Sequence, residues 1–239
     1  MNLNELKDIA INAAKEAGGF LNESKLEKKA VYKEEGRDIK LIIDQDTEKL
    51  IRSSLQLTDI PILGEEYGGE ISFGRYWVID PIDGTANYFR GLDECCVSIA
   101  LMEGYEALIG VVYNFNNNQM YTAVKDHGAF LNNTKISVSD IALRSKASIT
   151  TGFPASESIE SSMNFLENLK GWKKVRMFGS AALSCAYVAS GKCDYYAEKG
   201  VYLWDIAAGI CLVKEAGGFA DFKLIDKDRY EVVFSNNLL

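Results

Sequence analysis

The chain has 239 residues, of which 47% are hydrophobic and 25% are charged, a balance typical of a globular protein with a sizeable core. Its formal net charge of −8 offers no basic surface to nucleic acid. No apolar run reaches the roughly 18 residues of a membrane span, and no secretory signal pattern is present, so we expect a cytoplasmic protein that binds neither nucleic acid nor membrane.

The first half of the chain is predicted to begin with two helices. Residues 3–22 place apolar side chains at helical spacing, and Asp44 to about Leu55 repeats this pattern. A short strand within PILGEE, residues 61–66, then runs into a turn.

The segment WVIDPIDGTANY, residues 77–88, places two aspartates directly after an apolar stretch. Val and Ile favour a buried strand, and Pro81 cannot donate a backbone hydrogen bond, so we expect this strand to end at about Asp80. The glycine after Asp83 permits a sharp turn, and Thr85 is a candidate cap for a following helix. The two carboxylates are therefore expected to lie close together at a strand end, where they need a compensating cation.

Three further strand candidates follow at 95–102, 107–114 and 119–126, and their short connecting turns predict an antiparallel meander. His127, the only histidine, lies in the next predicted hairpin, so a zinc site with several histidines is excluded. The five cysteines form no CxxC pair and are expected to be free thiols in the core.

The second half is predicted to alternate strands with helices. Strands are expected at 147–151, 174–178, 193–197 and 231–235, and helices at 158–169, 180–190 and 205–217. No internal repeat or linker separates the halves. We therefore expect a layered α+β architecture in which helix pairs sandwich sheets.

Acidic residues stand at three places where an apolar segment meets a turn or a helix start: Glu65 with Glu66, Asp80 with Asp83, and Asp205 after Trp204. Such hard oxygen ligands suit Mg²⁺, which takes a few carboxylates and keeps waters for a phosphate substrate. Two such ions about 3.5–4 Å apart can activate a water and stabilise a leaving oxygen. The backbone N–H groups of Gly84, Thr85 and Ala86 offer a site for the phosphate. A phosphatase of the haloacid dehalogenase type is excluded, because its nucleophilic aspartate would fall at Pro81.

Three motifs in this order, GEE, WVIDPIDGTANY and WDIAAG with a later EAGG, resemble those of the inositol monophosphatase family of Mg²⁺-dependent, lithium-sensitive phosphatases. The resemblance covers almost the whole chain. It implies a layered αβαβα sandwich, the sugar-phosphatase-like fold, in a homodimer that hydrolyses small-molecule phosphate monoesters. It implies two or three Mg²⁺ ions, with Mn²⁺ able to substitute. It also implies one domain, 1–239, with a metal- and phosphate-binding part, 1–145, and a substrate side, 146–239.

The same resemblance implies roles for individual residues. The residues that resemble metal ligands are Glu65, Asp80 and the backbone oxygen of Ile82 for one ion, and Asp80, Asp83 and Asp205 for a second. The residues that resemble catalytic ones are Asp44, Thr85 and Glu65, with the first two orienting the attacking water. The residues that resemble substrate-binding ones are Lys33, Asp83, Gly84, Thr85, Gly179, Ser180, Ala181 and Glu198.

Structural interpretations of these residues remain open. Aspartates are favoured as helix caps, which is an alternative role for Asp44 and for the three aspartate ligands. Lys33 lies in a charged stretch that is also typical of a solvated loop. Glu198 is alternatively an ordinary acidic residue on the surface.

The substrate is also open. A second phosphate calls for an arginine or lysine near the hydroxyl-binding end, where this chain has Glu198, and this favours a polyol or sugar monophosphate. Lys199 and the basic run at 173–176 keep fructose 1,6-bisphosphate as an alternative, beside histidinol phosphate and 3′-phosphoadenosine nucleotides. The second alternative is a non-catalytic regulatory protein on the same fold. Such a protein would have no physical need for the complete set of carboxylates.

Overall fold

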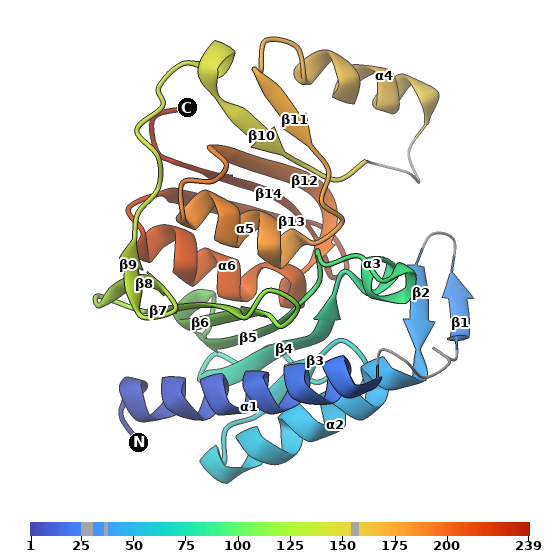
Figure 1. The fold of residues 1–239 in the computed structure, drawn as a ribbon, viewed down its shortest axis with the longest axis vertical. Coiled ribbons are helices and arrows are strands. Elements are labelled where there is room, and N and C mark those ends of the chain that lie inside the picture. The colour runs from blue at the N-terminus through green and yellow to red at the C-terminus, as the bar shows by residue number, and fades with distance from the viewer. Residues whose placement is uncertain (25–30, 36–37, 154–157) are drawn as a thin grey trace.

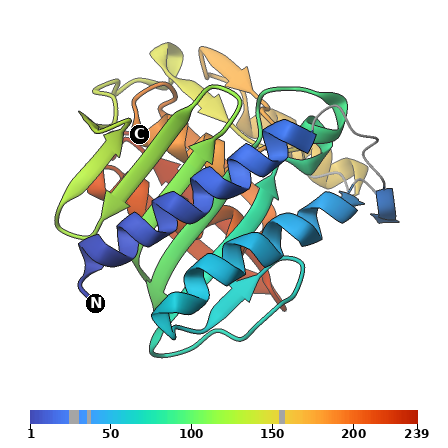
Figure 2. The same cartoon turned by 60° about the horizontal axis from the view of Figure 1, so that its bottom comes forward.

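Helices α1, Leu3–Glu23, and α2, Ile42–Leu55, form one outer layer of the computed structural model, which describes residues 1–24, 31–35, 38–153 and 158–239 (Figure 1). Helix α1 begins with a capping box in which Asn2 and Glu5 satisfy each other's backbone N–H groups. Both helices bury one stripe of residues at helical spacing. Figure 2 shows them side by side across one face of the central sheet.

The second layer is a seven-stranded sheet with the order β3-β4-β5-β6-β7-β8-β9. Its strands are β3 (Ile62–Gly64), β4 (Arg75–Asp83), β5 (Cys96–Glu103), β6 (Glu106–Asn114), β7 (Gln119–Val124), β8 (Gly128–Leu131) and β9 (Thr134–Ile136). Only β3 and β4 run parallel; the other neighbours are antiparallel and successive in the chain, which confirms the predicted meander.

Helices α5, Ala181–Ala189, and α6, Leu203–Glu215, form the third layer, between the two sheets (Figure 1). Most residues of both helices are buried, as expected for helices covered on two faces. Helix α6 packs directly on the sheet, because a Cβ at Gly110 would lie 2.3 Å from the carbonyl oxygen of Ala208.

The fourth layer is a five-stranded sheet with the order β11-β10-β12-β14-β13, and α4, Ile159–Asn168, covers its outer face (Figure 1). Its strands are β10 (Ser148–Thr150), β11 (Lys174–Arg176), β12 (Tyr195–Tyr202), β13 (Phe219–Asp226) and β14 (Arg229–Ser235). Strand β10 pairs in parallel with β11 and β12, and the remaining pairs are antiparallel. The order of layers is therefore αβαβα, which confirms the expected fold class.

The short elements are β1 (Val31–Glu35), β2 (Asp38–Leu41), α3 (Thr85–Arg90) and two 3-10 turns, η2 (Gln56–Thr58) and η3 (Arg144–Lys146). Strands β1 and β2 pair with each other, antiparallel. His127 lies in the turn between β7 and β8, as predicted, and all five cysteines are free and buried.

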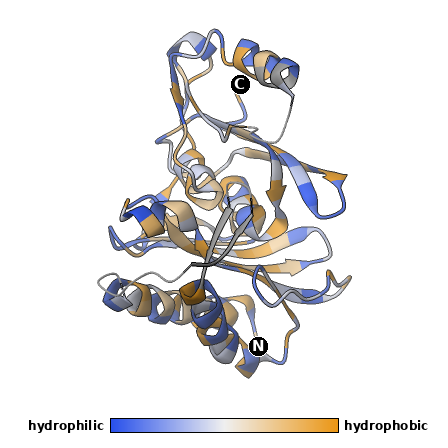
Figure 3. Cartoon of the chain, turned by 90° about the vertical axis from the view of Figure 1, so that its right-hand side faces the viewer, coloured by the Kyte–Doolittle hydropathy of each residue, from blue (hydrophilic) through white to orange (hydrophobic). Residues whose placement is uncertain are grey.

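The hydrophobic core lies on both faces of the central sheet. One cluster joins α1 and α2 to the sheet, and another surrounds α5 and α6. Figure 3 shows hydrophobic residues along the strands of both sheets and on the helices between them. No helix in the described ranges combines the length and the apolar character needed to cross a bilayer.

Several predicted boundaries were wrong. Strand β4 continues to Asp83 through a register shift, so Pro81 stands where no ladder hydrogen bond is needed. Strand β12 continues to Tyr202, and α6 begins two residues earlier than predicted. The hairpin β1–β2 and the strand β13 were not predicted; most of β13 is exposed, so its sequence lacks the alternation of a half-buried strand.

Candidate metal and phosphate site

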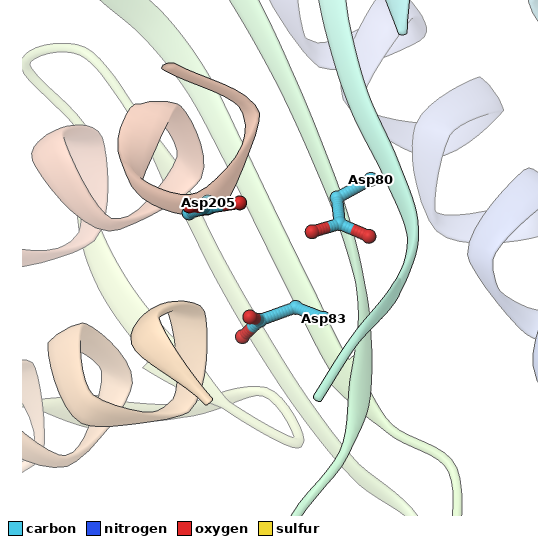
Figure 4. A group of neighbouring side chains, drawn as sticks. All are labelled: Asp80, Asp83 and Asp205. Carbon is cyan, nitrogen blue, oxygen red and sulfur yellow. The ribbon is translucent and has the colours of Figure 1, made fainter. Parts of the chain in front are cut away.

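Three aspartates meet between the central sheet and α6. Asp80 and Asp83 come from the end of β4, and Asp205 comes from the first turn of α6 (Figure 4). One carboxylate oxygen from each lies within 4.8 Å of the others. Asp80 is 2% exposed and Asp83 7%. Among the described residues, no lysine or arginine pairs with these three carboxylates.

A bulge in β4 brings two of these aspartates to the same side. Residues three apart in a regular strand point to opposite faces. Here Asp80 lies opposite Ser98 and Asp83 opposite Cys96, so β4 has one residue more than β5 in this interval. The bulge is held by the Asp80 carboxylate, which accepts the N–H of Ile82 at 2.9 Å.

The carboxylates raise one another's proton affinity. Burial raises the pKa of Asp80 well above its usual value, and the charges of Glu65 and Asp83 raise it further. Burial and the charge of Asp83 also raise the pKa of Asp205 well above its usual value. A divalent cation relieves this repulsion, so the donor set fits a hard metal ion such as Mg²⁺.

Glu65 lies directly after β3, in the turn that leads away from the sheet. Its backbone N–H donates to the carbonyl oxygen of Ile79 at 3.3 Å, and its side chain lines the same cavity as Asp80. Ile82, whose backbone oxygen is a predicted ligand, also lines this cavity.

Asp83 joins β4 to the N-terminus of α5. Its carboxylate accepts a short hydrogen bond from the Ser180 hydroxyl, the N–H of Ala182 at 2.8 Å and the N–H of Ala181 at 3.3 Å. The Cys96 thiol lies 3.7 Å away. These donors lower the pKa of Asp83, but burial outweighs them and the net shift is upward. The start of α5, predicted to face the substrate, therefore reaches the site by binding a carboxylate of the cluster.

Asp44 and Thr85 meet beside the cluster. The Thr85 hydroxyl lies 3.3 Å from a carboxylate oxygen of Asp44 and 2.9 Å from the carbonyl oxygen of Ile82. Asp44 belongs to the first turn of α2 and is buried. Gly84 has φ of +92°, and a Cβ there would lie 2.8 Å from the carbonyl oxygen of Glu94, so this turn requires glycine.

Glu198 projects from β12 toward the same cavity. Its carboxylate accepts the Tyr196 hydroxyl at 3.0 Å, and a Cβ at Gly152 would lie 1.9 Å from one of its oxygens. Burial raises the pKa of Glu198 to about 7, although the hydrogen bond from Tyr196 opposes this shift. The side chain is therefore poised to change charge near neutral pH.

A cavity of about 800 Å³ joins these groups. Its lining includes every predicted site residue except Asp44 and Lys33: Glu65, Asp80, Ile82, Asp83, Gly84, Thr85, Gly179, Ser180, Ala181, Glu198 and Asp205. Asp44 reaches the site through Thr85. The backbone of Lys33 lies in β1, but its side chain falls outside the described part of the structure.

The structure adds one cation that the sequence analysis missed. Arg229 lines the cavity, lies 3.7 Å over the ring of Tyr202 and donates to the carbonyl oxygen of Gly200. Tyr202 in turn stacks on Trp204 at 4.5 Å. In the sequence, Arg229 stands in DKDRY, which is indistinguishable from an ordinary charged turn. Lys199, which the sequence analysis considered instead, pairs with Glu231 and does not line this cavity.

Comparison with family models, known sequences and solved structures points to one family. A model of the inositol monophosphatase family matches residues 2–222. The chain is 39% identical to Nus factor SuhB of Xylella fastidiosa, over 94% of this chain and 84% of that protein. It is 35% identical to fructose-1,6-bisphosphatase/inositol-1-monophosphatase of Thermotoga maritima, over 90% of this chain and 82% of that protein. The crystal structure of the extragenic suppressor protein suhB of Bartonella henselae superposes with a TM-score of 0.88 at 32% identity, covering 97% of this chain and 93% of that one.

Proposed function

Since the chain belongs to the inositol monophosphatase family and is a phosphoric monoester hydrolase, we propose that it hydrolyses a polyol or sugar monophosphate, such as an inositol phosphate, with Mg²⁺ held by its carboxylates. The observation that carries this proposal is the convergence of Asp80, Asp83 and Asp205 within 4.8 Å, beside the pair of Asp44 and Thr85. We further propose that it acts as a cytoplasmic homodimer.

The proposed metal ligands are those expected from the family resemblance. Glu65, Asp80 and the backbone oxygen of Ile82 would hold one Mg²⁺, and Asp80, Asp83 and Asp205 a second, with room for a third ion left open. When bound, Mg²⁺ supplies the acidity that makes water a nucleophile near neutral pH and the positive charge that a phosphate requires. Oδ2 of Asp83 accepts both the Ser180 hydroxyl and the N–H of Ala182, whereas Oδ1 accepts only the N–H of Ala181 from α5. Oδ1 therefore keeps a lone pair for a metal ion, so binding to α5 does not prevent ligation.

The proposed catalytic pair is Thr85 and Asp44. The Thr85 hydroxyl is positioned by Asp44 and by the carbonyl oxygen of Ile82, and its oxygen can accept a hydrogen bond from the attacking water. Asp44 is buried and accepts from Thr85, so it fixes the direction of that hydroxyl and can take up the proton that passes through it.

The proposed substrate contacts divide into a phosphate end and a hydroxyl end. The backbone N–H groups that follow Asp83, from Gly84 to Ala86, line the cavity and would bind the phosphate, together with Lys33. Glu198 also lines the cavity and would bind the hydroxyls, because an ionised carboxylate accepts hydrogen bonds from hydroxyls and repels a second phosphate.

A second candidate is fructose 1,6-bisphosphatase. Arg229 lines the cavity, and a guanidinium can bind a phosphate through two parallel hydrogen bonds. The relative from Thermotoga maritima carries both activities in its name.

A phosphate-release screen tests the proposal. The purified protein is assayed with inositol 1-phosphate, fructose 1,6-bisphosphate, histidinol phosphate and 3′-phosphoadenosine 5′-phosphate, each with Mg²⁺ and with EDTA. We expect Mg²⁺-dependent release that is fastest with a polyol or sugar monophosphate. Release that persists in EDTA would contradict the metal assignment, and a preference for the bisphosphate would favour the second candidate.

A further inference from the structure

Glu48 is a buried acid that the proposed chemistry does not use. It lies on α2 one turn after Asp44, and its side chain is 0% exposed. Residues four apart on a helix lie on the same face, so both acids point from α2 toward the central sheet. Glu48, unlike Glu65, does not line the cavity that holds the aspartate cluster. Its carboxylate binds a backbone segment instead.

Both carboxylate oxygens of Glu48 are directed at the turn that carries Glu65. One oxygen accepts the N–H of Glu66 at 2.7 Å, and the other accepts the N–H of Tyr67 at 3.2 Å. The two residues that follow Glu65 are therefore fixed by a single side chain. Hydrogen bonds to an ionised acceptor are roughly twice as strong as neutral ones.

Arg52, one helical turn further along α2, completes this arrangement. Its Nε donates to Glu48 at 2.7 Å, and its Nη2 donates to the carbonyl oxygen of Gly68 at 2.6 Å. The guanidinium also stands 5.9 Å from the ring of Tyr67. The ion pair of Glu48 and Arg52 thus binds both ends of the turn. Glu48 accepts the N–H groups near its start, and Arg52 donates to the carbonyl oxygen of Gly68 near its end.

The backbone of the turn is shaped to accept this carboxylate. A Cβ at Gly64 would lie 2.2 Å from an oxygen of Glu48, so glycine is needed for so close an approach. The N–H of Gly64 donates to the carbonyl oxygen of Gly68 at 3.0 Å, and the N–H of Glu65 donates to that of Ile79 at 3.3 Å. Glu65 is consequently fixed on both sides, by β4 before the turn and by α2 after it.

We propose that Glu48, supported by Arg52, is a positioning residue that sets the place of the Glu65 carboxylate at the metal site. The inference rests on the proposed function, because it assumes that Glu65 binds metal. Apart from the bond from Arg52, both hydrogen bonds that Glu48 accepts come from the turn that carries the Glu65 ligand, and Arg52 itself donates to that turn. The same helix carries Asp44, so α2 sets the spacing between the pair Asp44–Thr85 and the Glu65 ligand.

The test measures metal binding directly. Glu48→Gln keeps the size of the side chain but loses the charge and places an amide N–H₂ against N–H donors. Free Mn²⁺ is followed by electron paramagnetic resonance while the ion is titrated into wild type and variant. We expect one Mn²⁺ site to weaken about 10- to 100-fold, the range found when groups that orient metal ligands are removed. The Mg²⁺ concentration for half-maximal activity should rise in parallel, with kcat largely restored at saturating Mg²⁺.

Asp194→Asn is the matched control. Asp194 is also a buried carboxylate, 4% exposed, and it accepts the N–H of Ser148 at 2.6 Å and the hydroxyl of Ser139, but it does not line the cavity. Asp194→Asn should lower the melting temperature and leave Mn²⁺ binding at the wild-type level. Arg52→Lys is a milder second variant, which keeps the charge but cannot donate to Glu48 and to Gly68 at the same time, as the guanidinium does. It should weaken Mn²⁺ binding at the site of Glu65 several-fold.

The outcomes separate this inference from the proposed function. Wild-type protein that binds no Mn²⁺ and releases no phosphate contradicts the proposed function. Wild-type binding together with unchanged binding in Glu48→Gln overturns the positioning role alone. If Glu48→Gln does not fold, Arg52→Lys decides, and wild-type Mn²⁺ affinity in that variant overturns the inference.

Discussion

Asp205 differs from Asp83 in what else its carboxylate does. Asp83 also binds the N-terminus of α5, whereas Asp205 accepts the single N–H of Tyr202, at 2.8 Å, at the start of its own helix. Removing the charge of Asp205 therefore affects the metal site with less damage to the fold than removing that of Asp83. Asp205 is the cleaner position at which to test the second metal.

We expect Asp205→Asn to lower kcat/KM by about 10²-fold or more, because a bound metal contributes several kcal/mol of charge stabilisation. The melting temperature without metal should change little, since one repelling charge is lost together with one helix-start acceptor. Phosphate release at saturating Mg²⁺ and calorimetry in EDTA check both parts. Turnover close to that of the wild type at saturating Mg²⁺ would refute the second metal site.

Substrate choice is expected to depend on Glu198. Glu198→Arg replaces a hydroxyl acceptor by a phosphate donor, beside the cation that Arg229 already supplies. The ratio of kcat/KM for fructose 1,6-bisphosphate to that for inositol 1-phosphate should rise, by a discrimination on the order of 1–3 kcal/mol. Taking the ratio on one variant cancels general damage, and Lys199→Ala, outside the cavity, serves as the control. An unchanged ratio would mean that Glu198 does not set specificity.

At the scale of elements, α1 offers a matched pair of neighbouring glycines. Gly18 is buried against the sheet, and a Cβ there would lie 2.7 Å from atoms of Phe115 and Tyr113. A Cβ at Gly19 meets nothing within 4 Å. The two positions share a helix and differ only in the face that they present.

Gly18→Ala should therefore destabilise the protein by about 1–3 kcal/mol through overpacking. Gly19→Ala should stabilise it by about 0.5–1 kcal/mol, because alanine loses less backbone freedom in a helix. Urea unfolding of both variants gives the two free energies. Equal effects at the two positions would contradict the packing of α1 on the central sheet.

Prediction from sequence succeeded where a signal is local and failed where it depends on distant neighbours. The local patterns predicted a layered α+β architecture, and the resemblance carried by the three motifs implied the αβαβα order and most of the residues that line the cavity. The continuation of β4 past Pro81 depends on a bulge against β5, which no residue of β4 reveals alone. Glu48 was overlooked because a glutamate in a charged helix shows nothing of the turn that it binds.

At the scale of the whole molecule, the carboxylates couple stability to pH. Burial raises the pKa of Asp80 and Asp205 well above their usual value and that of Glu198 to about 7. The folded, metal-free protein therefore binds more protons than the unfolded chain above about pH 4. The stability that these protons provide is complete below the unfolded pKa values and is lost as pH rises through the folded ones.

We accordingly expect the free energy of unfolding in EDTA to fall between about pH 4.5 and 7, the window set by Glu198, and to keep falling while the aspartates ionise. Saturating Mg²⁺ should reverse much of this loss, because the ion binds the deprotonated carboxylates of the folded state. Urea unfolding at several pH values, with EDTA and with Mg²⁺, measures the difference. If the increase in the free energy of unfolding caused by Mg²⁺ does not grow with pH, the proposed coupling between carboxylate ionisation and stability is contradicted.

The position of α6 also bears on how the protein is made. Asp205 follows Asp80 by roughly half the chain, and α6 fills the layer between the two sheets. The ribosome therefore releases the whole central sheet before the helix that covers its inner face. Until α6 arrives, the nascent chain exposes an apolar sheet and has an incomplete cluster with which to bind metal. We therefore expect metal to aid mainly the last steps of folding, and aggregation to compete most strongly before α6 has packed.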